Sequence, residues 1–204
     1  MRLLPFVAAA ALFGCASNPA RTSASVTEDN AVLARAYAED QADAERAAFV
    51  YEDGSAMPLD DLRQRLPYMP PELADDVHRL IAVDSVLAAD GARTANDFYH
   101  AAMIYQHGAD TTSYRRAYDL ATRAVELDPN HVDAKWLSAA AWDRYLDASG
   151  RRQWYGTQYR CDEDGLRYLL PVDEGRVSDD ERRALGVRTL AEAKALEGTE
   201  CGSP

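Results

Sequence analysis

The hydrophobic positions of this chain recur at helical spacing along most of its length and predict a mainly α fold. A first helix is expected within 28–50, on a drifting apolar stripe. Prolines and glycines interrupt the next stretch and leave room for a short helix over 59–66. A longer helix is expected over 71–89, with Gly91 as its stop, and a further one after Thr94.

The most regular pattern lies in residues 113–146. Ala117, Ala124 and Pro129 resemble the second half of a tetratricopeptide repeat, in which small residues let two helices approach and proline starts the next repeat. The first-helix signature of that repeat is absent, and a free-standing solenoid usually needs three or more repeats. We therefore expect antiparallel helix pairs with tetratricopeptide-like packing over 95–149 rather than a repeat array.

The pattern changes after residue 150. Aromatic and aliphatic residues on both sides of a turn at 162–165 predict a short irregular or β-hairpin segment near 151–172. Ser178 and Glu181 form a capping-box pattern that predicts a last pair of helices, ending near Leu196. Together these patterns predict six to eight helices in a single α-helical domain over 28–198, followed by a C-terminal tail at 199–204.

The first residues resemble a bacterial lipoprotein signal. Arg2 precedes an apolar run that ends at Phe13, and small residues surround Cys15. A run of about ten apolar residues is too short to span a hydrocarbon layer of ~30 Å. The resemblance implies that 1–14 is removed as a signal peptide and that Cys15 is lipidated, with palmitate among the chains. The alternative is a buried N-terminal helix with an incidental cysteine.

A lipid on Cys15 would place the protein in the cell envelope. Residues 15–27 would form the lipidated cysteine and a flexible tether to the domain. Ala16 follows the cysteine in place of the aspartate that resembles a plasma-membrane retention signal, so the periplasmic face of the outer membrane is expected in a diderm host. The membrane is then a partner through the lipid anchor.

The chain is acidic, with a formal net charge of −12 and no cluster of basic residues. Nucleic acids and anionic headgroups are therefore not expected as partners. Once Cys15 carries lipid, Cys161 and Cys201 remain and form either one disulfide or two free thiols. They lack metal-ligand spacing, and no phosphate loop or dinucleotide fingerprint is present, so no metal or other cofactor is expected.

Three groups of polar residues stand where helix packing alone would not require them. His100 and His107 are seven residues apart and share a helical face. Asp143 and Arg144 lie within an otherwise apolar helix, and the glycine in 153–158 allows backbone to approach a ligand. The candidate catalytic residues are His107, Asp110, Asp143 and Arg144, and the candidate ligand-binding residues are Gln106, Gln153, Tyr155, Gly156, Thr157 and Gln158.

These motifs resemble those of the bacterial domain of unknown function 6624 family. Its members combine a Gln-His pair and a following aspartate, an Asp-Arg pair and a Gln-x-Tyr-Gly-Thr-Gln stretch. Its further motifs correspond to Asp40, Gln41, Arg182, Arg183 and Gly186. The resemblance covers roughly 34–196, with an arginine displaced to Arg46 and a Gly-Trp-Pro element replaced at 90–94. The family has no assigned activity. The resemblance therefore implies where a site lies but not what the site does.

Two interpretations of these residues remain open. In the first, an aspartate orients the His107 imidazole, and Arg144 or amide donors hold an anionic or carbonyl group. In the second, Asp143 and Arg144 form an ion pair between helices, His107 caps its helix, and 153–158 covers them through buried hydrogen bonds.

The leading functional hypothesis is a lipid-anchored envelope protein that binds a protein partner or a small polar ligand. The alternative is a hydrolase-like enzyme that uses His107, Asp110, Asp143 and Arg144 around an activated water, since these motifs lack a serine or cysteine nucleophile. A metal site of His100, His107 and Asp110 would require both imidazoles to turn to one side.

Overall fold

A computed structural model describes residues 28–42, 59–69, 71–108 and 110–201. The predicted signal peptide, Cys15, the tether and residues 43–50 of the first expected helix lie outside these described residues. Within the described ranges, no helix is both long and apolar enough to cross a membrane.

The described chain is mainly helical and contains one small antiparallel sheet, which confirms the predicted fold class. The helices are α1 (Ala31–Ala42), α2 (Leu59–Arg65), α3 (Pro71–Ala88), α4 (Ala95–Gln106), α5 (Thr111–Leu127), α6 (Val132–Ala148), α7 (Asp179–Ala184) and α8 (Leu190–Lys194), with a 3-10 turn at Leu66–Tyr68. The strands are β1 (Tyr159–Cys161) and β2 (Arg167–Leu169), with Arg160 opposite Tyr168.

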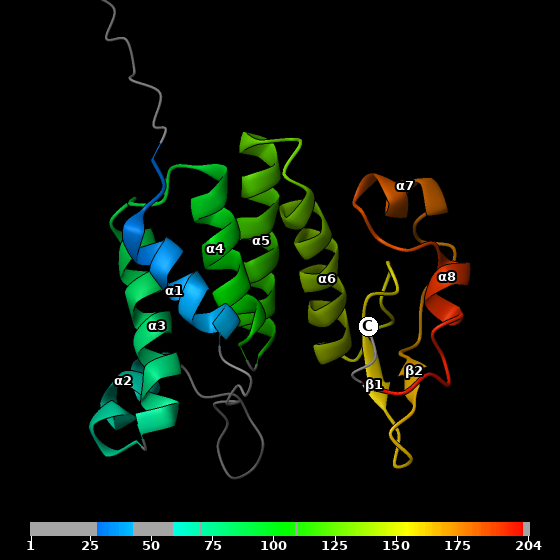
Figure 1. Cartoon of the computed structure of the whole chain (residues 1–204), viewed down its shortest axis with the longest axis horizontal. Helices are drawn as coiled ribbons and strands as arrows, with labels where there is room; N and C mark the ends of the chain where they lie inside the picture. The colour runs from blue at the N-terminus through cyan, green and yellow to red at the C-terminus, as the bar shows by residue number, and fades with distance from the viewer. Residues whose placement is uncertain (1–27, 43–58, 70, 109, 202–204) are drawn as a thin grey trace, which may run out of the picture.

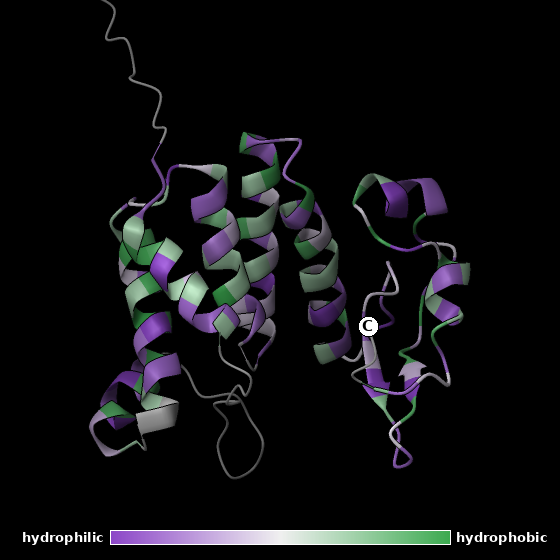
Figure 2. Ribbon diagram, viewed as in Figure 1, coloured by the Kyte–Doolittle hydropathy of each residue, from purple (hydrophilic) through white to green (hydrophobic). Residues whose placement is uncertain are grey.

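The helices α4, α5 and α6 stand side by side, and each is antiparallel to its neighbour in the chain (Figure 1). Helices α1 and α3 pack on the α4 flank, and the hairpin with α7 and α8 lies beyond α6. Hydrophobic and hydrophilic residues alternate along the helices, as expected when one side of each helix is buried (Figure 2).

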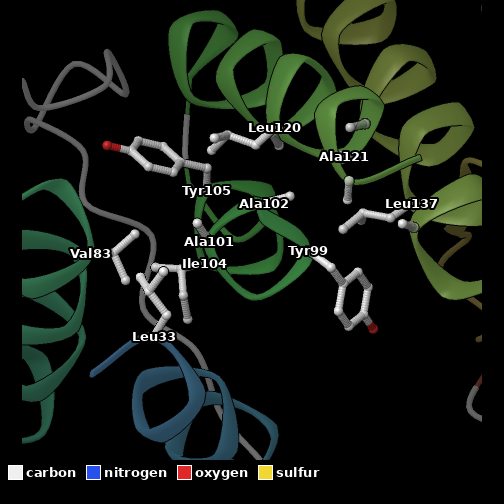
Figure 3. Close-up of a cluster of buried hydrophobic side chains, with 14 of the residues drawn as sticks. Leu33, Val83, Tyr99, Ala101, Ala102, Ile104, Tyr105, Leu120, Ala121 and Leu137 are labelled. Atoms are coloured by element: carbon white, nitrogen blue, oxygen red, sulfur yellow. The ribbon is translucent and has the colours of Figure 1, made fainter. Parts of the chain in front are cut away.

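The core is built from small residues between the paired helices and larger aliphatic residues at the α1 and α3 side. Ala102 of α4 and Ala121 of α5 are completely buried, and such residues allow close helix approach. Leu33, Val83 and Ile104 point toward one another from α1, α3 and α4 (Figure 3). Ala117 and Ala124, the alanines of the pattern that resembles a tetratricopeptide repeat, are also completely buried, on the helix that packs against both α4 and α6.

Local sequence signals mark the starts of two helices where the sequence pattern predicts them. Thr94 forms a capping box with Asp97 at the start of α4, and Ser178 forms one with Glu181 at the start of α7. The stop after α3 differs in detail, because Asp90 takes the left-handed conformation with φ 51°.

Helices α1 and α4 run in the same direction. The hydroxyls of Tyr37 and Tyr99 lie 3.3 Å apart, and further along both helices Asp40 Oδ1 lies 2.9 Å from His107 Nδ1. Residues later in α1 therefore contact residues later in α4, as expected for two parallel helices.

Helix α6 runs in that direction too. The rings of Tyr99 and His131 are 4.9 Å apart at the start of α6, and Arg144 reaches Gln106 near its end. The C-terminal ends of α1, α4 and α6 consequently meet at one end of the bundle, where the polar residues described below gather.

The C-terminal segment is tied to the hairpin. A disulfide joins Cys161 and Cys201, whose Cα atoms are 6.2 Å apart. Leu166 and Glu200 form an isolated antiparallel bridge. Residues 199–201, which the sequence pattern places in a tail, therefore belong to the folded part of the chain.

Candidate functional site

Asp143 organises the loop that follows α6. Its side chain is fully buried and accepts hydrogen bonds from the backbone N–H groups of Trp154 at 2.7 Å, Tyr155 at 3.0 Å and Thr157 at 3.0 Å. The Thr157 hydroxyl donates a further bond at 2.8 Å. Burial raises the pKa of the Asp143 carboxyl, and these hydrogen bonds act against that rise. Since every contact donates to Asp143, the pattern suits the ionised carboxylate.

Gln153 is the second buried organiser of this loop, with 1% of its surface exposed. Its Nε2 donates to the carbonyls of Leu170 at 2.7 Å and Gln158 at 3.0 Å, and its Oε1 accepts from the Gln158 N–H at 2.9 Å. Gly156 adopts φ 84°, a conformation that other residues rarely take. Gln153 and Gly156 therefore set the shape of the loop.

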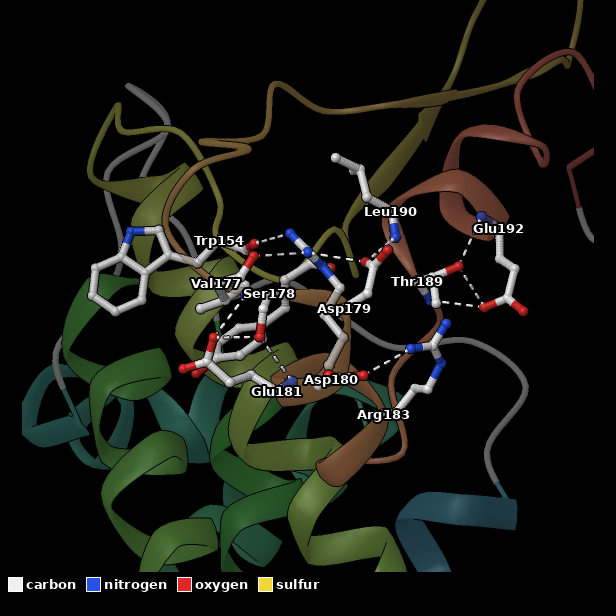
Figure 4. Close-up of polar contacts among 12 residues, drawn as sticks. Trp154, Val177, Ser178, Asp179, Asp180, Glu181, Arg183, Thr189, Leu190 and Glu192 are labelled. Atoms are coloured by element: carbon white, nitrogen blue, oxygen red, sulfur yellow. Dashed lines mark hydrogen bonds and ion pairs between the residues drawn. The ribbon is translucent and has the colours of Figure 1, made fainter.

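Arg182 holds the same loop from the other side. It is 2% exposed and donates to the carbonyls of Trp154 at 2.8 Å and Tyr155 at 3.0 Å. Its own position is fixed by the Val177 carbonyl, just before α7, and by Asp179 at the start of α7, both labelled in Figure 4. Figure 4 also shows the capping contacts of Ser178 with Glu181 and of Thr189 with Glu192.

Most of the polar groups described in 153–158 thus form hydrogen bonds within the protein. Asp143, Gln153, Tyr155 and Thr157 belong to a hydrogen-bond network that fastens the C-terminal segment to α6. The second interpretation is wrong in one part, since Asp143 and Arg144 do not pair: Asp143 binds the loop, and Arg144 points toward α4. Consecutive helical residues point about 100° apart, which explains the divergence.

A second polar group lies at the end of α4. The Asp40 carboxylate, 5% exposed on its side chain, binds Nδ1 of His107, whose side chain is 22% exposed. Gln41 donates to the other Asp40 oxygen at 2.7 Å. A carboxylate accepts a hydrogen bond from Nδ1–H, so this contact orients the imidazole and leaves Nε2 on the side away from Asp40.

Asp110 does not orient His107, although it is the nearest aspartate in the sequence. It is the N-cap of α5 and accepts a hydrogen bond from the Ser113 N–H at 2.6 Å. His107 itself is the C-cap of α4. The aspartate that orients His107 is therefore Asp40, because the start of α5 takes the Asp110 carboxylate.

Arg144 connects α6 to the same end of α4. Its Nη1 donates to the Gln106 carbonyl at 2.6 Å, and its Nε donates to Gln158 Oε1 at 3.3 Å. The guanidinium also lies 5.6 Å from the ring centre of Tyr114. Burial raises the pKa of Tyr114, and the positive charge of Arg144 opposes that effect.

The ends of α1, α4 and α6 and the loop after α6 therefore bring together five polar residues, of which only Gln106 and His107 are neighbours in the sequence. We call this group the α4-end site, and it consists of Asp40, Gln106, His107, Arg144 and Gln158. Sequence reasoning singled out all of them except Asp40, which entered only through the family resemblance. The signal in the sequence that could identify Asp40 is the Asp-Gln motif of that family, Asp40 and Gln41, at the end of α1.

A metal centre does not form from the histidines. His100 stacks on Tyr37 at 4.5 Å, while His107 binds Asp40 and Asp110 caps α5. In the ranges that the structure describes, no group of three or more metal-ligating side chains is placed to hold an ion.

The comparisons with known proteins leave the chain without an assigned relative. No protein-family model matches it, no curated protein is detectably similar in sequence, and no solved structure matches its fold.

Proposed function

We propose that this protein is a lipid-anchored protein of the cell envelope that binds a small polar ligand at the α4-end site. The observation that carries the proposal is the half-buried His107, which Asp40 holds while the Arg144 guanidinium binds the carbonyl of the preceding residue, Gln106. An oriented imidazole and a guanidinium together can hold a carboxylate or carbonyl group.

Two features support the proposed location: the N-terminal signal pattern and a disulfide of the kind found in exported proteins. Cys161 and Cys201 form a disulfide, and disulfides persist in oxidising compartments outside the cytosol. Mass spectrometry of the protein isolated from its host should find an N-terminal Cys15 that carries acyl chains. Release of the Cys15→Ser variant from the membrane fraction supports the anchor, and retention of this variant contradicts it.

Ligand binding can be tested with acetate and inorganic phosphate as probes. We expect the His107 ring signals to shift during an NMR titration with one of these anions. Arg144→Gln should weaken that binding about tenfold, because a charge-assisted hydrogen bond is lost. Arg123→Gln, on the exposed side of α5, is the matched control and should bind like the unaltered protein.

The absence of any shift at His107 with either anion would contradict the proposal. An equal loss in Arg144→Gln and Arg123→Gln would mean that only the overall charge matters.

A hydrolase-like activity is the second candidate, and the Asp40–His107 contact favours it. An imidazole whose Nδ1 is held by a buried carboxylate can accept a proton from water at Nε2 and so act as a general base. Asp40 takes the role first considered for Asp110 and Asp143. His107→Ala should then abolish turnover of an ester or amide substrate while the melting temperature stays within a few degrees. Loss of both together would contradict this role.

A further inference from the structure

Two buried glutamines, Gln153 and Gln106, differ in the hydrogen bonds that their side-chain amides form. Gln153 is 1% exposed and makes three side-chain hydrogen bonds. Gln106 is 4% exposed, and its Oε1 is buried without a hydrogen-bond partner among the residues that the structure describes. A buried acceptor without a partner destabilises a protein, so an unpaired amide in this position requires an explanation.

Gln106 lies on the side of α4 that faces α1 and α6. Residues seven apart share a helical face, so Gln106 shares the face of Tyr99. Tyr99 contacts Tyr37 of α1 and His131 of α6. At the level of Gln106 itself, Arg144 of α6 binds the Gln106 carbonyl. The unpaired amide therefore belongs to the residue at the centre of the α4-end site.

Other unpaired polar atoms gather along the same side. Four buried side-chain atoms have no hydrogen-bond partner within the described part of the chain. Besides Gln106 Oε1, His100 Nδ1 and His131 Nε2 belong to residues that contact the Tyr37 and Tyr99 rings between α1, α4 and α6. Three of the four unpaired buried atoms of the described residues therefore belong to side chains on this side of α4.

We propose that Gln106 determines ligand specificity in the α4-end site, with its Oε1 accepting a hydrogen bond from an N–H group of the ligand. This inference rests on the proposed ligand-binding function. Arg144 binds the backbone carbonyl of Gln106, and His107 is the next residue, so the ligand class is a small carboxylic acid that carries an amide N–H near its carboxylate. A site with a buried acceptor discriminates against an analogue that lacks the donor, because the acceptor stays unpaired in that complex.

Two small probes test the donor directly. N-acetylglycine and 4-oxopentanoate differ only by an N–H in place of a CH2 group, and both keep the carbonyl and the carboxylate. We expect the protein to bind N-acetylglycine about tenfold more tightly in an NMR titration, as one recovered hydrogen bond predicts. Gln106→Met should bind both probes with the affinity that the unaltered protein has for 4-oxopentanoate.

The outcomes separate the two proposals. Equal affinity of the unaltered protein for both probes overturns the role of Gln106 and leaves the binding function standing. Binding of neither probe, together with no response to acetate or phosphate, overturns the binding function and this inference with it.

Stability measurements give a second readout that needs no ligand. Gln106→Met removes an unpaired amide, so its melting temperature should equal or exceed that of the unaltered protein. Gln153→Met is the matched control, and it should melt several degrees lower because it strands the groups bonded to Gln153. A comparable decrease in melting temperature in both variants would show that the Gln106 amide forms hydrogen bonds within the protein, and this would overturn the inference.

Discussion

Asp40 Oδ1 lies 2.9 Å from His107 Nδ1, although 67 residues separate the two in the chain. The contact joins the last turn of α1 to the C-cap of α4 and places a nearly buried carboxylate behind a partly exposed imidazole. It thereby converts a helix-end histidine into an oriented group that a ligand or water can reach.

The tautomer of His107 should depend on Asp40. Asp40→Ala removes the acceptor for Nδ1–H, so the neutral imidazole should shift from the Nδ1–H form toward the Nε2–H form. Nitrogen-15 NMR of the ring measures this directly. Asp110→Ala is the matched control: it should cost about 1 kcal/mol of unfolding free energy through its lost helix cap and leave the tautomer unchanged. A tautomer shift in the Asp110 variant would contradict the assignment.

Asp143 should be essential for stability. Asp143→Ala leaves three buried N–H groups and one hydroxyl without their acceptor, so we expect a loss of about 3 to 5 kcal/mol in unfolding free energy, measured by urea denaturation. Asp147→Ala, which breaks an exposed pair with Arg160 one turn along α6, should cost about 0.5 kcal/mol. Similar small losses in both variants would contradict the organising role of Asp143.

Gly156 should tolerate no side chain without strain. A Cβ there would lie 3.6 Å from Ala193, an ordinary contact, so the effect of Gly156→Ala comes from its φ of 84°. We expect a loss of about 1 to 2 kcal/mol in unfolding free energy. Gly175→Ala is the control, because nothing lies within 4 Å of its Cβ position and its φ is not left-handed. It should change stability by less than about 0.5 kcal/mol.

Acidification should destabilise the fold through His100. Burial lowers the pKa of His100 below its usual value of 6.5, while Asp29 and Asp97 raise it and His131 lowers it further. The unfolded chain therefore takes up a proton before the folded one, and stability falls as pH decreases from about 7 through the folded pKa. Each bound proton changes the unfolding free energy by up to about 1.4 kcal/mol per pH unit.

His100→Phe keeps a ring beside Tyr37 and should flatten this pH dependence between pH 7.5 and 5. His78→Gln, at an exposed position of α3, serves as the control and should retain it. Urea denaturation at several pH values measures the unfolding free energy of both variants. If this free energy depends on pH in His100→Phe as it does in the unaltered protein, His100 is excluded as the cause.

Local sequence patterns alone determined the elements of this fold. Helical periodicity, the caps at Thr94 and Ser178 and the turn at 162–165 act between residues a few positions apart. Each therefore leaves a direct trace in the sequence, and the mainly α fold with a short hairpin could be predicted from them.

Only the tertiary structure decided which polar residues meet. Asp110 is three residues from His107, yet Asp40 binds it, because α1 and α4 run side by side. Asp143 and Arg144 are neighbours in sequence, but helix rotation sends one to the loop and the other to α4. Partner choice depends on contacts between distant segments, and residue types and spacing do not record those contacts.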